Sequence, residues 1–252
     1  MLKMTRGGLQ WLEFELFSKI PNVVHGCFLR HGGFSAGSCG SLNVSMSRGD
    51  DPGAVQANLE KICGLFPGMR LVGGHQTHSD QIAIVGDNGD IIPSCDALIT
   101  NKRGVALLIK TADCQAAVVY DPVRLVIANI HAGWRGNVQN IYGKTVKRMQ
   151  EEFGCRPDDL LVGISPSLGP DASEFVNYRK EFPQEFWPYQ VTTNHFDLWA
   201  IARKQFQDAG VLSHHIEIAE QCTRSNPEDF FSHRYDKAAG RQATIIGLFP
   251  FF

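Results

Sequence analysis

The sequence lacks the patterns that mark several large classes of protein. No apolar run is long enough to span a membrane or to form the core of a signal peptide, and the Lys and Arg residues are scattered rather than clustered. This gives no electrostatic footprint for a nucleic-acid duplex or an anionic membrane. Neither G-x-G-x-x-G nor G-x-x-x-x-G-K occurs, so no dinucleotide or nucleoside triphosphate cradle is indicated. We therefore expect a cytoplasmic protein that acts on small molecules and binds neither nucleic acid nor membrane.

Cysteine usage excludes two further classes. The seven cysteines form an odd count without a C-x-x-C pair, which argues against both a disulfide framework and a zinc ribbon. Internal repeats, low-complexity tracts and flexible linkers are also missing, and the net charge is only -2. At 252 residues and 43% hydrophobic content, the chain is long enough to bury a large core. We expect a single domain over residues 1–252.

Hydrophobic patterning predicts a mixed α/β fold. Short runs rich in β-branched residues alternate with segments of helical period. Helices are expected over 52–63, from Asn137 as N-cap to the stop at Gly154, and from about Asp197 to Gly210. The expected strands are Gln81–Val85, Val105–Ile109, Ala116–Tyr120, Leu125–Ile130, Leu160–Ile164 and Ala243–Leu248.

A predicted hairpin carries the first chemical signal. The strands at 116–120 and 125–130 are separated by Asp121-Pro-Val-Arg124 alone, a connection short enough for antiparallel neighbours. Pairing Asp121 with Arg124 places Cys114 directly opposite His131. Opposed residues have Cβ atoms roughly 4.5–5.5 Å apart, so the thiolate and the imidazole could share one metal ion or one proton.

The segment "GGHQTHSD" supplies further candidate ligands, His75 and His78. One cysteine with two histidines is the ligand set of an open catalytic zinc site, whose fourth position accepts water or substrate. The same ligands with a distant Met hold blue copper, although nothing marks an axial Met here. A metal-free pair, with Cys114 as nucleophile and His131 as base, uses the same geometry. The spacing leaves these alternatives open, as it does the choice between the two histidines.

The motif "IHAGWRG" (130–136) follows the second strand of the hairpin. Its glycines would let the backbone turn sharply, and a helix beginning near Asn137 would aim free N–H groups at the same place as Arg135. This combination predicts an anion site, with phosphate as the candidate. The alternative is a plain strand-to-helix turn in which Trp134 caps the core and Arg135 is solvated. The charged C-terminal segment before the last strand, which includes Arg241, is expected to be solvated.

Several motifs together carry a resemblance to a known family. They are "HGCFLRHGGFSAG", "SLNVS", "HQTHSD", "TADC", "HAGWRG", "GISPSLGP" and "CTRSNPEDFFSHR…GRQA", in order from about His25 to Leu248. This set resembles the laccase-domain family, whose members have been called polyphenol oxidases, peptidoglycan editing factors and purine nucleoside phosphorylases with adenosine deaminase activity. The resemblance implies a layered sandwich of mixed β-sheets flanked by helices. It also implies a zinc ion held by His78, Cys114 and His131, which leaves His75 for substrate contact.

The resemblance implies a chemistry as well. The expected reactions are phosphorolysis of adenosine, inosine, guanosine or methylthioadenosine, and hydrolytic deamination of adenosine, so a purine nucleoside and phosphate are the expected partners. We expect Cys114 and His131 to serve catalysis as well as metal binding. Arg135, with Arg30 and Asn43, would hold the anion or the ribose, and Asp113 would move protons.

This sequence departs from the family pattern at three places. Asp171-Ala172 stands where two cysteines are common, Gln115-Ala116 where Val-Pro is common, and Leu59 where an Arg is usual. The expected ligands are kept, so the departures concern the substrate preference.

Other functions use the same residues. A cysteine hydrolase acting on an amide of cell-wall precursors would use Cys114 and His131. A copper-binding polyphenol oxidase is a further alternative, although nine scattered histidines without an H-x-H pair fit a multicopper enzyme poorly. A non-catalytic metal-binding or partner-binding module is the third. Copper is the alternative metal, and the sequence leaves the oligomeric state open.

Overall fold

Two six-stranded mixed sheets form the framework of the molecule. The computed structural model describes residues 1–86 and 94–250. The first sheet has the order β1 (Leu2–Arg6), β2 (Leu9–Glu13), β3 (Val23–Phe28), β14 (Gln242–Leu248), β7 (Val105–Thr111) and β4 (Arg70–Gly73). The second has the order β13 (Ile216–Ile218), β10 (Leu161–Ile164), β8 (Gln115–Asp121), β9 (Val126–Ala132), β6 (Ala97–Thr100) and β5 (Ile82–Ile84). A separate ribbon pairs β11 (Gln190–Thr192) with β12 (His195–Phe196).

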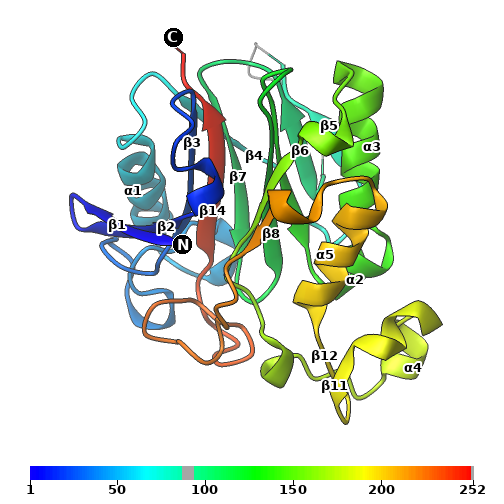
Figure 1. The fold of residues 1–252 in the computed structure, drawn as a ribbon. Helices are drawn as coiled ribbons and strands as arrows, with labels where there is room; N and C mark the ends of the chain where they lie inside the picture. Colours follow the sequence, from blue (N-terminus) through cyan, green and yellow to red (C-terminus); the bar gives the residue numbers. More distant parts are fainter. Residues whose placement is uncertain (87–93, 251–252) are drawn as a thin grey trace.

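Helices cover the outer faces of both sheets, as Figure 1 shows. On one side lies α1, whose Ile62 packs against Leu108 and Ile245 of the first sheet. On the opposite side, α3 and α5 pack on the second sheet through residues such as Val146 and Phe206. The α-helices are α1 (Pro52–Cys63), α2 (Trp134–Val138), α3 (Ile141–Phe153), α4 (Tyr178–Glu181) and α5 (Leu198–Asp208). The 3-10 helices are η1 (Glu15–Phe17), η2 (Gly37–Cys39), η3 (Met46–Arg48), η4 (Pro157–Asp159), η5 (Pro170–Ala172), η6 (Gln184–Tyr189) and η7 (Ser213–His215). The predicted layered α/β class is confirmed, and none of the described helices is long and apolar enough to cross a membrane.

The layer between the sheets is the central core. Alternate residues of each strand point into it, among them Leu107 and Ile246 from the first sheet and Val118 and Ile127 from the second. Buried Asn129 crosses the layer: its side-chain Nδ2 donates to the carbonyl oxygens of residue 107 and residue 244, each at 2.9 Å. These two bonds fix β9 against the first sheet at the level where the functional site begins.

The predicted hairpin of β8 and β9 is present, but its predicted register is wrong by two residues. Asp121 pairs with Val126, and His131 lies opposite Ala116. The connection is longer than expected because Asp121 Oδ1 accepts the N–H groups of residues 123 and 124, at 2.8 and 2.9 Å, and Leu125 adopts a left-handed conformation with φ 55°. A slip of two residues keeps every side chain on its predicted face. Cys114 therefore remains near His131, diagonally rather than directly opposite.

The helix expected after the glycine-rich motif is divided in two, so the prediction of Asn137 as its N-cap is wrong. The short α2 begins at Trp134, and Asn137 lies buried within it. The true cap of α3 is Asn140, whose left-handed φ of 52° interrupts the helical path and whose Oδ1 accepts the N–H of Gly143. The predictions for α1 and α5 are confirmed, with Asp197 capping α5.

Candidate metal centre

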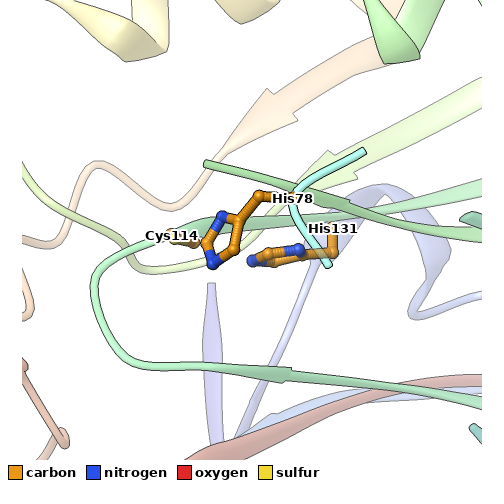
Figure 2. Close-up of side chains that lie close together, drawn as sticks. All are labelled: His78, Cys114 and His131. Atoms are coloured by element: carbon orange, nitrogen blue, oxygen red, sulfur yellow. The ribbon is translucent and has the colours of Figure 1, made fainter. Parts of the chain in front are cut away.

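Three side chains from separate segments converge at one end of the inter-sheet layer. His78 comes from the loop between β4 and β5, Cys114 from the turn between β7 and β8, and His131 from the end of β9. Figure 2 shows these side chains gathered around one point. One donor atom from each lies within 4.8 Å of the others. The structure thus brings together the residues that the family resemblance names as ligands.

A single carboxylate bonds the ring of His131 and the backbone of His78. Asp96 is fully buried, and its Oδ1 lies 2.7 Å from Nδ1 of His131 and 3.0 Å from the backbone N–H donor of His78. Its Oδ2 accepts both the N–H and the hydroxyl of Ser79, each at 2.7 Å. Because Nδ1 of His131 is engaged by the carboxylate, Nε2 is the nitrogen left for a ligand.

The ionisation of these groups follows from their neighbours. Burial lowers the pKa of His131, but the hydrogen bonds to Asp96 and Cys114 outweigh it and raise the pKa to about 9. Burial acts against the charge of Asp96 as well, yet the bonds from His131 and Ser79 hold the pKa of this carboxyl far below its usual range. Burial, with the adjacent His131 charge, lowers the pKa of His78. The two imidazoles thus differ in pKa: it is raised for His131, which bonds Asp96, and lowered for His78.

Gly133 leaves the space in which the side chains meet. A Cβ at this position would lie 2.8 Å from Nδ1 of His78 and 3.1 Å from Sγ of Cys114. The backbone angles of Gly133, φ -77° and ψ -177°, are ones that any residue adopts. Its glycine is therefore required by the close approach of the site and not by backbone conformation.

The donor set fits a zinc ion. A thiolate with two imidazoles provides three corners of a tetrahedron and leaves the fourth for water or substrate. Metal-ligating histidines typically donate their other ring N–H to a carboxylate, which is the arrangement of His131 and Asp96. The same atoms also form a nucleophile, a base and an orienting acid in the order Cys114, His131, Asp96. His78 has a place in the first arrangement and no evident place in the second.

The centre opens onto a cavity of about 850 Å³. Its apolar lining comes from Val44, Met46, Leu59, Cys63, Leu71 and Leu108. Its polar lining includes His75, Gln76 and the three candidate ligands, together with Arg48, Glu60, Lys110, His233 and Arg241. The size and the mixed lining are those of a site for a small molecule.

Two of the predicted substrate residues are engaged elsewhere. Arg30 donates from Nε to the carbonyl of Gly40 at 2.9 Å and from Nη1 to the carbonyl of Pro227 at 2.7 Å, and it stacks on Phe231. Asn43 is buried and accepts the backbone N–H of Arg241 at 2.9 Å. Neither belongs to the described lining of the cavity. Both side chains join loops, and their predicted contact with substrate stays a prediction.

Asp113 and Arg135 also lie outside the described cavity lining. Asp113 accepts the hydroxyl of Thr223 at 2.7 Å and the backbone N–H of Arg234 at 2.6 Å, so each carboxylate oxygen has a partner. Arg135 is exposed and stacks on Trp134, 4.4 Å from the ring centre. The roles predicted for these two residues stay predictions. His75, in contrast, does line the cavity.

Sequence reasoning missed several residues of the site. Asp96 stands alone before a short strand, and no spacing links it to His131. The expectation that Arg241 is solvated is wrong: it is partly buried and lines the cavity, together with Arg48 and Lys110. The signal that could have found Arg241 is its place in "GRQA", one of the motifs that carry the family resemblance.

The three departures from the family pattern occupy different places. Leu59 of α1 lines the cavity, where it makes one wall apolar. Gln115 is buried behind the site, where its Oε1 accepts the hydroxyl of Tyr142 and its Nε2 donates to the carbonyl of Leu198. Asp171 is exposed on η5. Of the three departures, Leu59 is therefore the one expected to change the substrate preference most.

Comparisons with known proteins agree with this arrangement. The family described as "Multi-copper polyphenol oxidoreductase laccase" matches residues 24–249. A protein of Bacteroides thetaiotaomicron named purine nucleoside phosphorylase is 33% identical over 88% of this chain and 90% of its own. The purine nucleoside phosphorylase YlmD of Geobacillus stearothermophilus is 33% identical over 89% of this chain and 90% of its own. The crystal structure of YlmD from the same organism superposes with a TM-score of 0.87, covers 98% of both chains and is 30% identical.

Proposed function

Because the chain belongs to this laccase family and its relatives bear the name purine nucleoside phosphorylase, we propose that it cleaves purine nucleosides with inorganic phosphate. The observation that carries the proposal is the convergence of His78, Cys114 and His131 at the edge of a cavity large enough for a nucleoside. Adenosine, inosine, guanosine and methylthioadenosine are the proposed substrates. The apolar wall at Leu59, Leu71 and Leu108 suits the flat purine base.

We assign Zn²⁺ to the three ligands. When bound, the ion supplies a Lewis acid that polarises an oxygen of the bound reactants. The chain contributes the rest: Asp96 holds the His131 ring in one tautomer, and the same carboxylate fixes the backbone of the loop that carries His78. Gly133 keeps the approach to the centre open.

In phosphorolysis, an oxygen of phosphate forms a bond to C1′ of the ribose while the bond from C1′ to N9 of the purine breaks. The electron pair of that bond goes to the purine, which takes up a proton, and the products are ribose 1-phosphate and the free base. The site must therefore hold an oxyanion and the base at once. The cavity offers both a charged wall and an apolar wall for this purpose.

Hydrolytic deamination of adenosine is the second activity that we propose for the same site. Water adds at C6 of the base, ammonia leaves, and inosine is formed. A three-ligand centre with its fourth position open to substrate suits this step too. Both activities would then depend on the same three side chains.

A cysteine hydrolase is a different candidate, favoured by one observation. Cys114, His131 and Asp96 stand in the order of a nucleophile, its base and the acid that orients the base. Such an enzyme would act on an amide through a covalent adduct at Cys114 and would need no metal.

The experiment is product analysis by mass spectrometry of the purified protein with adenosine and phosphate, beside a Cys114→Ala variant. We expect adenine and ribose 1-phosphate, with inosine from the deaminase branch. The Cys114→Ala variant lacks one of the three metal ligands, so its transition state loses several kcal/mol of charge stabilisation. We therefore expect its rate of adenosine cleavage to fall by about a thousandfold. The same samples are analysed for metal, with one zinc per chain expected; copper in its place would contradict the metal assignment. Two results together would replace this proposal with the cysteine hydrolase. The first is that folded, metal-loaded protein leaves adenosine intact. The second is that an amide substrate forms a covalent adduct at Cys114 even when a chelator is present.

A further inference from the structure

The lining of the cavity includes four basic side chains, Arg48, Lys110, His233 and Arg241. They come from distant parts of the chain: η3, the end of β7 and the segment leading into β14. Among the described residues that line the cavity, Glu60 alone carries a carboxylate. Folding therefore gathers positive charge here without gathering an equal negative charge.

The hydrogen-bond partners of the two arginine side chains are backbone carbonyls: Nη2 of Arg48 donates to Lys237, and Nη1 of Arg241 donates to Ala239 and Gly240. Across residues 1–86 and 94–250, none of the four takes part in an ion pair. Nε of Arg48 and Nδ1 of His233 are buried without a hydrogen-bond partner, and so is the hydroxyl of Thr111, which lines the same cavity. Buried polar atoms are normally satisfied, so the protein alone does not complete the hydrogen bonding of these three residues.

The charges of Arg48 and Arg241 also act on one another and on the ring of His233. Burial lowers the pKa of Arg241, and the nearby Arg48 lowers it further. Burial lowers the pKa of Lys110. Burial again comes first in lowering the pKa of His233, followed by Lys237 and Arg241. Like charges held together in this way favour an anion between them.

The cluster lies next to the metal centre. Arg241 lines the same cavity as Cys114 and His78, and its charge is close enough to lower the pKa of His78. Lys110 stands on β7 two residues beyond Leu108 of the apolar wall and four before Cys114. Lys110 thus lies on the strand that leads from Leu108 of the apolar lining toward the candidate ligand Cys114.

We propose that Arg48, Lys110, Arg241 and His233 form the binding site for a phosphate-class oxyanion beside the metal centre. The oxyanion is inorganic phosphate or a phosphoryl group carried by the substrate. This inference rests on the proposed function only in naming phosphate as a reactant. It also moves the anion site away from Arg135 and the start of α2, where the sequence placed it.

The first test is binding, since it does not require turnover. Titration calorimetry of the metal-loaded protein with inorganic phosphate compares the parent with Lys110→Gln and Arg48→Gln. We expect phosphate affinity to fall at least about tenfold in each variant, as expected for the loss of a charged hydrogen-bond donor. Lys147→Gln is the matched control, because Lys147 is an exposed lysine on α3 that forms an ion pair with Glu151 at the surface. Thermal unfolding and metal content verify that each variant is folded and loaded.

The second test separates this site from the proposed function. In the phosphorolysis assay the KM for phosphate should rise at least about tenfold in Lys110→Gln, while the KM for the nucleoside stays unchanged. Turnover with an unchanged KM for phosphate would refute the site and leave the function standing. Phosphate binding that the variants abolish, without any nucleoside cleavage, would refute the function and leave the site standing.

A parallel titration with adenosine 5′-monophosphate identifies the source of the oxyanion. If the nucleotide binds tightly and inorganic phosphate does not bind, the site recognises the phosphoryl group of a substrate. If inorganic phosphate binds, the site holds the phosphate that takes part in the reaction as co-substrate. If neither ligand binds at millimolar concentration, or if both bind the variants as well as the parent, the proposal fails.

Discussion

Two buried histidines face the same layer from opposite sheets and differ in almost everything except burial. His25 of β3 is 4% exposed and His131 of β9 is 3% exposed. His25 lies among Phe14 and Phe17, where its Nε2 accepts the backbone N–H of Phe14 at 2.8 Å. His131 lies against Asp96, with Cys114 and His78 beside it. Burial lowers the pKa of His25 to about 4, whereas the carboxylate raises the pKa of His131 to about 9 despite burial.

The difference separates a structural histidine from a functional one. In the apolar region, one hydrogen bond satisfies the ring and the neutral form completes the core. In the polar region, the carboxylate selects the tautomer and turns the second nitrogen toward other donors. Burial therefore does not identify a ligand; the partner of the second ring nitrogen does. Three substitutions test this distinction.

Asp96→Asn should have the largest effect, because it removes the charge that defines the polar region. Outer partners of metal-ligating histidines typically contribute 10- to 100-fold to metal affinity. We expect the zinc dissociation constant, measured by competition with a chromophoric chelator, to rise by about that factor. The amide retains one acceptor oxygen, so the chain should still fold.

Asp80→Asn provides the control for this substitution. Asp80 lies in the same loop, two residues after His78, but its carboxylate pairs with Lys144 at the surface. We expect this change to leave zinc affinity within about twofold, because exposed ion pairs contribute little. Equal affinities in the Asp96 and Asp80 variants would show that the carboxylate does not distinguish the two histidines.

His25→Gln should alter the response of stability to acid. The pKa of His25 is about 4 in the folded protein, below the 6.5 of a free imidazole, so the unfolded chain binds the proton more readily. The stability that depends on the neutral ring is complete above pH 6.5 and is lost as the pH falls toward 4. By pH 5 this loss amounts to about 2 kcal/mol, or about 30-fold in the unfolding equilibrium. Glutamine can accept the same N–H without titrating.

Urea unfolding at pH 7 and pH 5 measures this effect. The parent should lose about 2 kcal/mol more than the Gln variant between the two pH values. His214→Gln, at an exposed position on η7, should lose as much as the parent. An identical pH response in all three proteins would mean that His25 is protonated in the folded state, and the comparison with His131 would fail.

The sequence could predict the framework and part of the site. Runs of β-branched residues predicted β7 and β14 of the first sheet and β5, β8, β9 and β10 of the second, whereas β1 to β4, β6 and β13 were not predicted. Cys114 and His131 could be brought together from a hairpin because a slip of two residues does not change the face. The family resemblance then selected His78. The single-domain interpretation stays a prediction.

What the sequence could not predict depends on contacts between segments that no local rule joins. The short strand β6 of four residues carries too little pattern to be recognised, and Asp96 immediately precedes it. Lys110 and Arg241 are isolated charges in the sequence, and they line the same cavity because β7 and β14 pair, with Lys110 opposite Ala243. Asn43 resembled a substrate residue, yet its side chain supports the backbone of Arg241.

Gly133→Ala should have the smallest effect and tests whether the polar region depends on space as well as charge. A methyl group here would stand 2.8 Å from His78 and 3.1 Å from Cys114, and overpacking of this kind costs roughly 1–3 kcal/mol. Because the backbone angles suit alanine, we expect zinc affinity to fall by about tenfold. Gly136→Ala is the control, since its Cβ would meet nothing closer than 3.4 Å and alanine favours the helix. If both variants bind zinc equally, the ligands can shift apart at no cost, and the carboxylate alone distinguishes His131 from His25.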